Sequence, residues 1–239
     1  LDATVDAISA RLRELTSRTM LRRGAVVAMS GGIDSSVTSA LAVKALGPKK
    51  VFGLMLPELD SNSESGRLGE LLAKHHGIEY AVEDIAPALH GLDCYGRRDE
   101  AYKRVFPEYG EGWKAKIVLP GGLLESDRMN VYRLVVQDPD GNMHEERLPV
   151  DAYLQIVAAT NFKQRIRKTM EYYHADRLNY AVFGTPNRLE YDQGFFVKNG
   201  DGSADIKPIA HLYKTQVYAL ARHLGLPDEI CSVIPTTDT

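Results

Sequence analysis

The chain has 239 residues, of which 44% are hydrophobic and 26% charged, and it fits one large globular domain or one domain with an inserted lobe. Its net charge of −3 argues against general nucleic-acid binding, because there is no basic excess to neutralise phosphates. No apolar run approaches the roughly 20 residues of a membrane span, and the first residues lack a signal-peptide core. We therefore expect a cytoplasmic protein with no nucleic-acid or membrane partner.

The two cysteines, Cys94 and Cys231, lie far apart and lack C-x-x-C spacing. This arrangement indicates neither a zinc site nor a disulfide framework. We interpret both as buried or incidental thiols.

The chain opens with apolar residues at helical spacing. Val5, Ile8, Leu12 and Leu15 predict an amphipathic helix over roughly the first 17 residues. Such a helix can pack on a sheet or on a partner subunit.

A glycine- and serine-rich loop joins a strand-like run, residues 25–29, to a helical pattern over residues 37–46. It reads Ser30-Gly31-Gly32-Ile33-Asp34-Ser35-Ser36. Adjacent glycines let backbone N–H groups approach an anion without interference from Cβ, and the serine hydroxyls add donors at the positive end of the helix dipole. The loop is therefore typical of a polyphosphate cradle, with a plain glycine turn as the alternative.

Asp34 lies inside this loop, where its carboxylate would repel a bare phosphate. A divalent cation between the carboxylate and the ligand would remove that conflict. The loop has neither the G-x-x-x-x-G-K-[ST] pattern nor the G-x-G-x-x-G pattern. It resembles instead the SGGxDS pyrophosphate loop of the ATP pyrophosphatases, which holds the part of ATP that leaves as pyrophosphate.

Strands and helices alternate after the loop. Residues 50–57 indicate a buried strand, residues 66–76 a helix and residues 79–85 a third strand. This βαβαβ order predicts an α/β fold with a doubly wound parallel sheet. The polar stretch at residues 60–65 follows the second strand, so it is either part of a nucleotide site or a solvated loop.

The middle of the chain, about residues 95–151, is less regular and has the least motif content. A turn at residues 138–142 separates two strand-like segments, residues 131–137 and 143–148. We expect a β-hairpin inserted into a single domain that spans residues 1–239. The hairpin could act as a lid, a dimer contact or a specificity device.

A helical pattern returns over about residues 153–173, and residues 178–183 predict a strand that leads into a second glycine-containing loop. Charge runs on helices usually mark a solvated face. We interpret Arg167 and Lys168 in that way.

The chain resembles the NAD synthetases within the ATP pyrophosphatases, and its second half carries the runs that narrow the family. The similarity is ordered and colinear, covers most of residues 24–94 and 155–236, and is carried by four runs: Asn161-Phe162-Lys163-Gln164-Arg165, residues 184–190, residues 194–209 and Leu212-Tyr213-Lys214-Thr215-Gln216. The resemblance implies amidation of the nicotinate carboxylate of deamido-NAD. The carboxylate attacks the α-phosphate of ATP, pyrophosphate leaves, and ammonia converts the acyl-adenylate to the amide.

The resemblance also assigns roles at the phosphates. Asp34 and Glu190 match ligands of Mg²⁺, and Lys214 matches a lysine that stabilises the leaving group. The catalytic set implied is Asp34, Lys198 and Lys214. The ATP-binding set implied is Ser30, Gly31, Gly32, Asp34, Ser35, Ser36, Thr185, Lys214 and Thr236.

Arg165 and Asp205, together with Lys198 of the catalytic set, match contacts to deamido-NAD. Each role has a simpler alternative: a helix cap for Thr185, a loop salt bridge between Lys198 and Asp205, and a strand-end surface carboxylate for Glu190. Residues 199–203 suit either a mobile substrate loop with glycine hinges or a plain turn.

The resemblance implies a homodimer, with nitrogen from free ammonia or from a separate glutaminase subunit. Two alternatives remain open. One is another ATP pyrophosphatase, which amidates a different substrate or transfers sulfur through Cys94 or Cys231. The other is a nucleotide-binding regulator without turnover.

Overall fold

The computed structural model describes residues 1–119 and 132–232. The chain divides into two compact units, one formed by Leu1–Pro87 and Gln164–Thr239 and the other by Ala88–Lys163. Within the described residues no helix is both long and apolar enough to cross a membrane.

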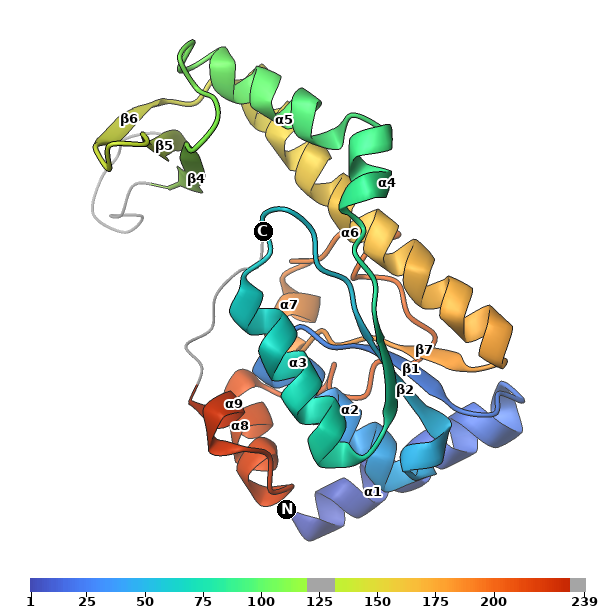
Figure 1. Cartoon of the computed structure of the whole chain (residues 1–239). Helices are drawn as coiled ribbons and strands as arrows, with labels where there is room; N and C mark the ends of the chain where they lie inside the picture. The colour runs from blue at the N-terminus through green and yellow to red at the C-terminus, as the bar shows by residue number, and fades with distance from the viewer. Residues whose placement is uncertain (120–131, 233–239) are drawn as a thin grey trace. The chain divides into compact units, whose positions relative to one another are not determined.

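The first unit is built on a parallel sheet with the strand order β3-β2-β1-β7 (Figure 1). Its strands are β1 (Ala25–Ala28), β2 (Val51–Met55), β3 (Glu79–Val82) and β7 (Ala181–Phe183). In register, Val26 lies beside Phe52 of β2 and Val182 of β7. The predicted α/β fold with a doubly wound parallel sheet is confirmed.

The first unit also contains several helices. They are α1 (Asp2–Arg13) with its π-helical extension Glu14–Thr19, α2 (Ile33–Leu46), the 3-10 turn Pro48–Lys50, α3 (Ser63–His76), α7 (Arg188–Asp192), α8 (Lys214–His223) and α9 (Asp228–Cys231). Helix α2 starts four residues earlier than the predicted helical pattern. As a result Asp34, Ser35 and Ser36 lie in its first turn.

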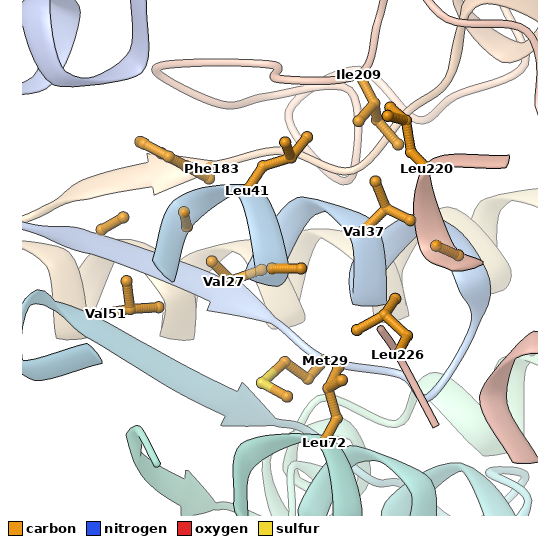
Figure 2. Packing of buried hydrophobic residues seen from close by; sticks show 14 of the residues in the cluster. Val27, Met29, Val37, Leu41, Val51, Leu72, Phe183, Ile209, Leu220 and Leu226 are labelled. Atoms are coloured by element: carbon orange, nitrogen blue, oxygen red, sulfur yellow. The ribbon is translucent and has the colours of Figure 1, made fainter. Parts of the chain in front are cut away.

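The hydrophobic core on one face of the sheet surrounds α2. Val27 and Met29 from the β1 segment pack there with Val37 and Leu41 of α2 and with Phe183 of β7 (Figure 2). Residues that alternate with these point to the other face, where Phe52 stacks on His174 with ring centroids 5.0 Å apart. Burial of β1, β2 and β7 on both faces explains why these three strands are continuously apolar, whereas the edge strand β3 is partly exposed.

Helix α6 (Val150–Leu178) runs from the second unit into the first. The second unit also holds α5 (Cys94–Lys103) and the antiparallel strands β4 (Lys114–Val118), β5 (Arg133–Gln137) and β6 (Met143–Arg147), and α4 (Ala86–Gly91) begins at its boundary. Strands β5 and β6 are the predicted inserted hairpin, except that residue 131 lies outside the described residues. At the turn, the Asn142 N–H donates to Asp138 Oδ1 at 2.8 Å.

His76, at the end of α3, makes stability dependent on pH. Its Nε2 is buried without a hydrogen-bond partner among the described residues, and burial, with a smaller contribution from His75, lowers the pKa of His76 to about 4. Because this pKa lies below the ordinary value of about 6.5, the folded state favours the neutral ring. The contribution of His76 to the free energy of unfolding is therefore full at neutral pH. It decreases as the pH falls, by up to about 1.4 kcal/mol per pH unit.

We expect His76→Phe to flatten the dependence of the unfolding free energy on pH between about pH 6.5 and about pH 4. Urea denaturation at several pH values measures it. His211→Asn, at an exposed position outside α3, serves as the control. Equal slopes for His76→Phe and the wild type would contradict the assignment.

Candidate active site

The candidate site lies where the strand order reverses. The chain passes from β1 outward through β2 and β3 and returns to the other side of β1 as β7. The loops after β1 and β7 therefore diverge at one edge of the sheet, and open parallel sheets bind ligands in such a crevice. The loop at residues 30–32 follows β1, and Gly184 and Thr185 follow β7.

Of the two loop glycines, Gly31 adopts a backbone conformation and a close packing that require glycine. Its φ is +76°, and a Cβ at this position would lie 2.6 Å from the Cβ of Leu68 on α3. Gly32 has a φ of −73°, and a Cβ there would meet Ser30 Oγ, at 3.3 Å, and, apart from its chain neighbours, no other atom of residues 1–119 and 132–232 within 4 Å. Gly31 thus shapes the loop, whereas Gly32 keeps space open above it.

The N-terminus of α2 is suited to an anion. Its N-cap residue is Gly32, which offers no side chain to cap the helix. The hydroxyls of Ser35 and Ser36 both donate to the Gly32 carbonyl, each at 2.9 Å, and this holds the turn in place. N–H groups of the first helical turn remain available to a ligand, as in other phosphate sites.

A cavity of about 280 Å³ opens over this loop, and it brings together many of the residues proposed from the sequence. Asp34 and Lys214 form an ion pair inside it, and Asn187 Nδ2 donates to Asp34 Oδ1 at 3.4 Å. The proposed site residues that line it are Ser30, Gly31, Gly32, Asp34, Ser35, Thr185, Glu190 and Lys214.

Glu190 enters this cavity from α7, a helix that depends on its own capping. Asn187 Oδ1 accepts from the N–H groups of Leu189 and Glu190, while Glu190 Oε2 accepts from the Asn187 N–H at 3.1 Å. Burial raises the pKa of Glu190, and the charge of Asp34 acts in the same direction. The N-x-x-E spacing of this capping box was the sequence signal that Glu190 belongs to a helix rather than to a strand end.

Lys214 is the first residue of α8. A cation at a helix N-terminus is opposed by the helix dipole. Its placement there, against Asp34, is consistent with a role toward a ligand rather than with helix stability.

Some other residues proposed from the sequence do not line the first cavity, or have another local role. The Ser36 hydroxyl is directed to Gly32, and Asn187, not Thr185, is the cap of α7. Thr236 lies outside the described residues. The polar stretch at residues 60–65 contributes Asn62, Glu64 and Ser65 to the cavity.

Arg165, Lys198 and Asp205 do not line this cavity. The guanidinium of Arg165 donates through Nε to the Lys198 carbonyl at 3.1 Å, so these two cationic residues are neighbours. Asp205 Oδ2 accepts from the Val182 N–H at 2.8 Å, and Tyr172 donates to its other oxygen at 3.4 Å.

A second cavity, of about 300 Å³, adjoins the first and shares with it Ser30, Ser35, Asn62, Ser65, Thr185 and Asp201. Its walls are the ends of β1 and β2 and one face of α6. The interpretation of Lys168 as part of a solvated face is wrong: Lys168 is 5% exposed and Glu171 4%. Asp201, which borders both cavities, belongs to the segment 199–203 that the sequence left open as a substrate loop or a turn. Phe195 and Tyr218, in the first cavity, had no predicted role.

The donor set fits a magnesium ion held between protein and ligand. Among the described residues no group of three or more His, Cys, Asp or Glu side chains is placed to hold a metal ion alone. Asp34 and Glu190 nevertheless line one cavity above the loop at residues 30–32. Mg²⁺ is commonly bound by one or two carboxylates together with substrate phosphates.

The fold, with a serine–glycine loop and two carboxylates lining one cavity at the switch point of the sheet, is that of a class, the nucleotide-binding α/β proteins that include the ATP pyrophosphatases. Comparison with known proteins narrows the class. A model of the NAD synthase family matches residues 4–103 and 124–239. The chain belongs to the NAD synthase family.

Individual relatives agree with this assignment. The chain is 60% identical over 237 residues to the NH(3)-dependent NAD(+) synthetase of Rhizobium meliloti (strain 1021), covering 99% of this chain and 70% of the relative. It is 37% identical over 216 residues to the enzyme of the same name from Thermotoga maritima, covering 90% and 71%. The solved NH3-dependent NAD synthetase of Campylobacter jejuni has the same fold, with a TM-score of 0.66 at 22% identity over 99% of this chain and 78% of that one.

Proposed function

We propose that the chain is an ammonia-dependent ligase that amidates the nicotinate carboxylate of deamido-NAD to form NAD, with ATP as co-substrate. The observation that carries the proposal is the meeting of Asp34, Glu190, Thr185 and Lys214 over the phosphate loop of one cavity. This arrangement supports transfer at the phosphates of a nucleotide. The relatives named as NH(3)-dependent NAD(+) synthetases support the choice of substrates.

The reaction begins at the α-phosphate of ATP. A carboxylate oxygen of the substrate bonds to the α-phosphorus, the bond from that phosphorus to the bridging oxygen breaks, and pyrophosphate leaves. Ammonia then attacks the acyl carbon, AMP departs with the electrons of the acyl–oxygen bond, and a proton is lost from nitrogen. Negative charge grows on phosphoryl oxygens in the first step, so cationic groups and backbone N–H donors favour it.

Different residues of this chain are assigned to the phosphates, to Mg²⁺ and to deamido-NAD. The N–H groups at the start of α2 and the hydroxyl of Ser30 hold phosphate oxygens, while Ser35 and Ser36 hold the turn through the Gly32 carbonyl and Lys214 stabilises the departing pyrophosphate. Mg²⁺, held by Asp34 and Glu190, would neutralise phosphate charge. We assign Thr185 and Thr236 to ATP, and Arg165, Lys198 and Asp205 to deamido-NAD. The contact between Arg165 and the Lys198 carbonyl is consistent with a shared cationic site.

We propose that residues 1–239 act as one catalytic domain with an inserted region at about residues 95–151. The protein would be a cytoplasmic homodimer that uses free ammonia or receives it from a separate glutaminase subunit.

The direct test incubates the protein with Mg²⁺, ATP, ammonium and a panel of carboxylates that includes deamido-NAD and nicotinate mononucleotide. We expect AMP and NAD to form in equal amounts with deamido-NAD, and no AMP without a carboxylate. AMP formation only with another carboxylate would overturn the choice of substrate.

The metal assignment predicts that Glu190→Gln raises the Mg²⁺ concentration needed for half-maximal turnover by about tenfold or more. Glutamine keeps an oxygen that can accept the Asn187 N–H, so α7 retains its cap while the charge is lost. A magnesium titration of AMP release measures the effect. An unchanged magnesium requirement in Glu190→Gln would remove Glu190 from the metal site.

A further inference from the structure

The face of α6 that lines the second cavity is polar throughout. It consists of Gln164, Arg167, Lys168 and Glu171, whose spacing of i, i+3, i+4 and i+7 places them on one side of the helix. A helix face that packs on a sheet is normally apolar at this spacing. This face is therefore suited to a polar ligand rather than to packing.

Lys168 and Glu171 form a buried ion pair on that face. Lys168 Nζ and Glu171 Oε2 are 2.6 Å apart, and the side chains are 7% and 6% exposed. A buried ion pair is a poor source of stability, because the cost of removing both charges from water offsets their attraction. An ammonium has three N–H donors and a carboxylate has two acceptor oxygens, so the pair can bond to each other and still offer a donor and an acceptor to a ligand.

Arg167, by contrast, is committed to the protein. Its Nε donates to the Leu56 carbonyl at 3.3 Å and its Nη2 to Ser61 Oγ at 3.4 Å, which braces the segment after β2. That segment, with Met29, forms the apolar side of the cavity. An apolar wall opposite a few polar groups is the usual arrangement around a flat organic ligand.

We propose that the Lys168–Glu171 pair is a recognition element for the nucleoside of ATP. It contacts a group that carries a donor and an acceptor side by side, as the amidine edge of adenine and the ribose hydroxyls both do. The inference rests on the proposed function, because Ser30, Ser35 and Thr185 border both cavities and place bound phosphates next to this pair.

The test replaces both residues together with side chains of similar size, Lys168→Met with Glu171→Leu. Removing one partner alone would leave a buried unpaired charge, whereas the double replacement should fold with equal or greater stability. We expect the Kd for α,β-methylene-ATP, measured by calorimetry, to rise at least about tenfold, since hydrogen bonds to charged groups are being removed. A folded double variant that binds within about twofold of the wild type would overturn the proposal.

A matched control uses an exposed pair of the same residue types. Lys74 and Glu70 are bonded at 2.9 Å on α3 with side chains 64% and 40% exposed, and Lys74→Gln with Glu70→Gln should leave the Kd unchanged. Binding of this analogue requires no amidation. Absence of AMP formation by the wild type would therefore reject the proposed function, while an unchanged Kd in the Lys168–Glu171 variant would reject this inference.

Analogues identify the contacted group. The 2′-deoxy form of ATP lacks a ribose hydroxyl, and purine riboside triphosphate lacks the 6-amino group. We expect one of them to bind more weakly than ATP to the wild type but not to the double variant. Equal losses in both proteins for both analogues would show that the pair does not contact the nucleoside.

Discussion

Asp34→Asn should lower kcat/KM by about 10³-fold or more, a loss of about 4 kcal/mol of transition-state stabilisation. The substitution removes the carboxylate that would bind Mg²⁺ and that pairs with Lys214. These are the two cations proposed to neutralise the phosphates. Asparagine keeps an oxygen for Asn187 and nearly the same shape. AMP release at saturating Mg²⁺ with ATP, ammonium and deamido-NAD measures the effect.

Asp192→Asn is the matched control for this variant. Asp192 lies on α7, pairs with Arg188 at 3.1 Å and has a side chain that is 55% exposed. Because an exposed pair of this kind contributes little, we expect wild-type turnover within about twofold. If the wild type turns over and Asp34→Asn does not, the protein is not a regulator without catalysis. Near-normal activity of Asp34→Asn would show that this residue has no role in the reaction.

Gly31→Ala should destabilise the fold by about 2–4 kcal/mol and also abolish most activity. Two costs add at this position. Alanine is strained at a φ of +76°, and its Cβ would lie 2.6 Å from the Cβ of Leu68, which is itself buried. Relief of that clash must move the phosphate loop away from α3. Thermal unfolding and AMP release measure the two effects.

Gly32→Ala tests whether space for the ligand matters when the loop backbone is not strained. With a φ of −73° the backbone accepts alanine, so the melting temperature should stay close to that of the wild type or rise slightly. Its Cβ would project where the ligand is proposed to lie, and the KM for ATP should rise. If the two alanine variants were equally stable, the strain assigned to Gly31 would be wrong.

Local features of the sequence predicted the strands of the parallel sheet, the phosphate loop and the inserted hairpin, because each depends on near neighbours. Strand runs, glycine turns and helical periodicity are visible within about ten residues. Helix α7 was not predicted, since five residues hold too little periodicity to detect. Its Asn187–Glu190 capping box was the available signal.

The interpretation of α6 shows why burial is harder to predict than conformation. The charges at Arg167 and Lys168 resemble a solvated face, and the helix itself was predicted correctly. Whether such a face meets water or a cavity depends on what lies opposite. Here the ends of β1 and β2 lie opposite, and they come from a distant part of the chain.

The sequence by itself determined the phosphate loop, the doubly wound order of strands and helices, and the resemblance to one family, since these depend on short-range sterics, hydrogen bonding and motif order. The resemblance also predicted that Asp34, Glu190 and Lys214 act at the same phosphates, and the tertiary structure places them in one cavity. Only the tertiary structure decided that Lys168 and Glu171 border the next cavity. The physical reason is the pairing of β1 with β7. Burial of these strands side by side brings together loops that are about 150 residues apart in the chain, a separation over which local propensity has no influence.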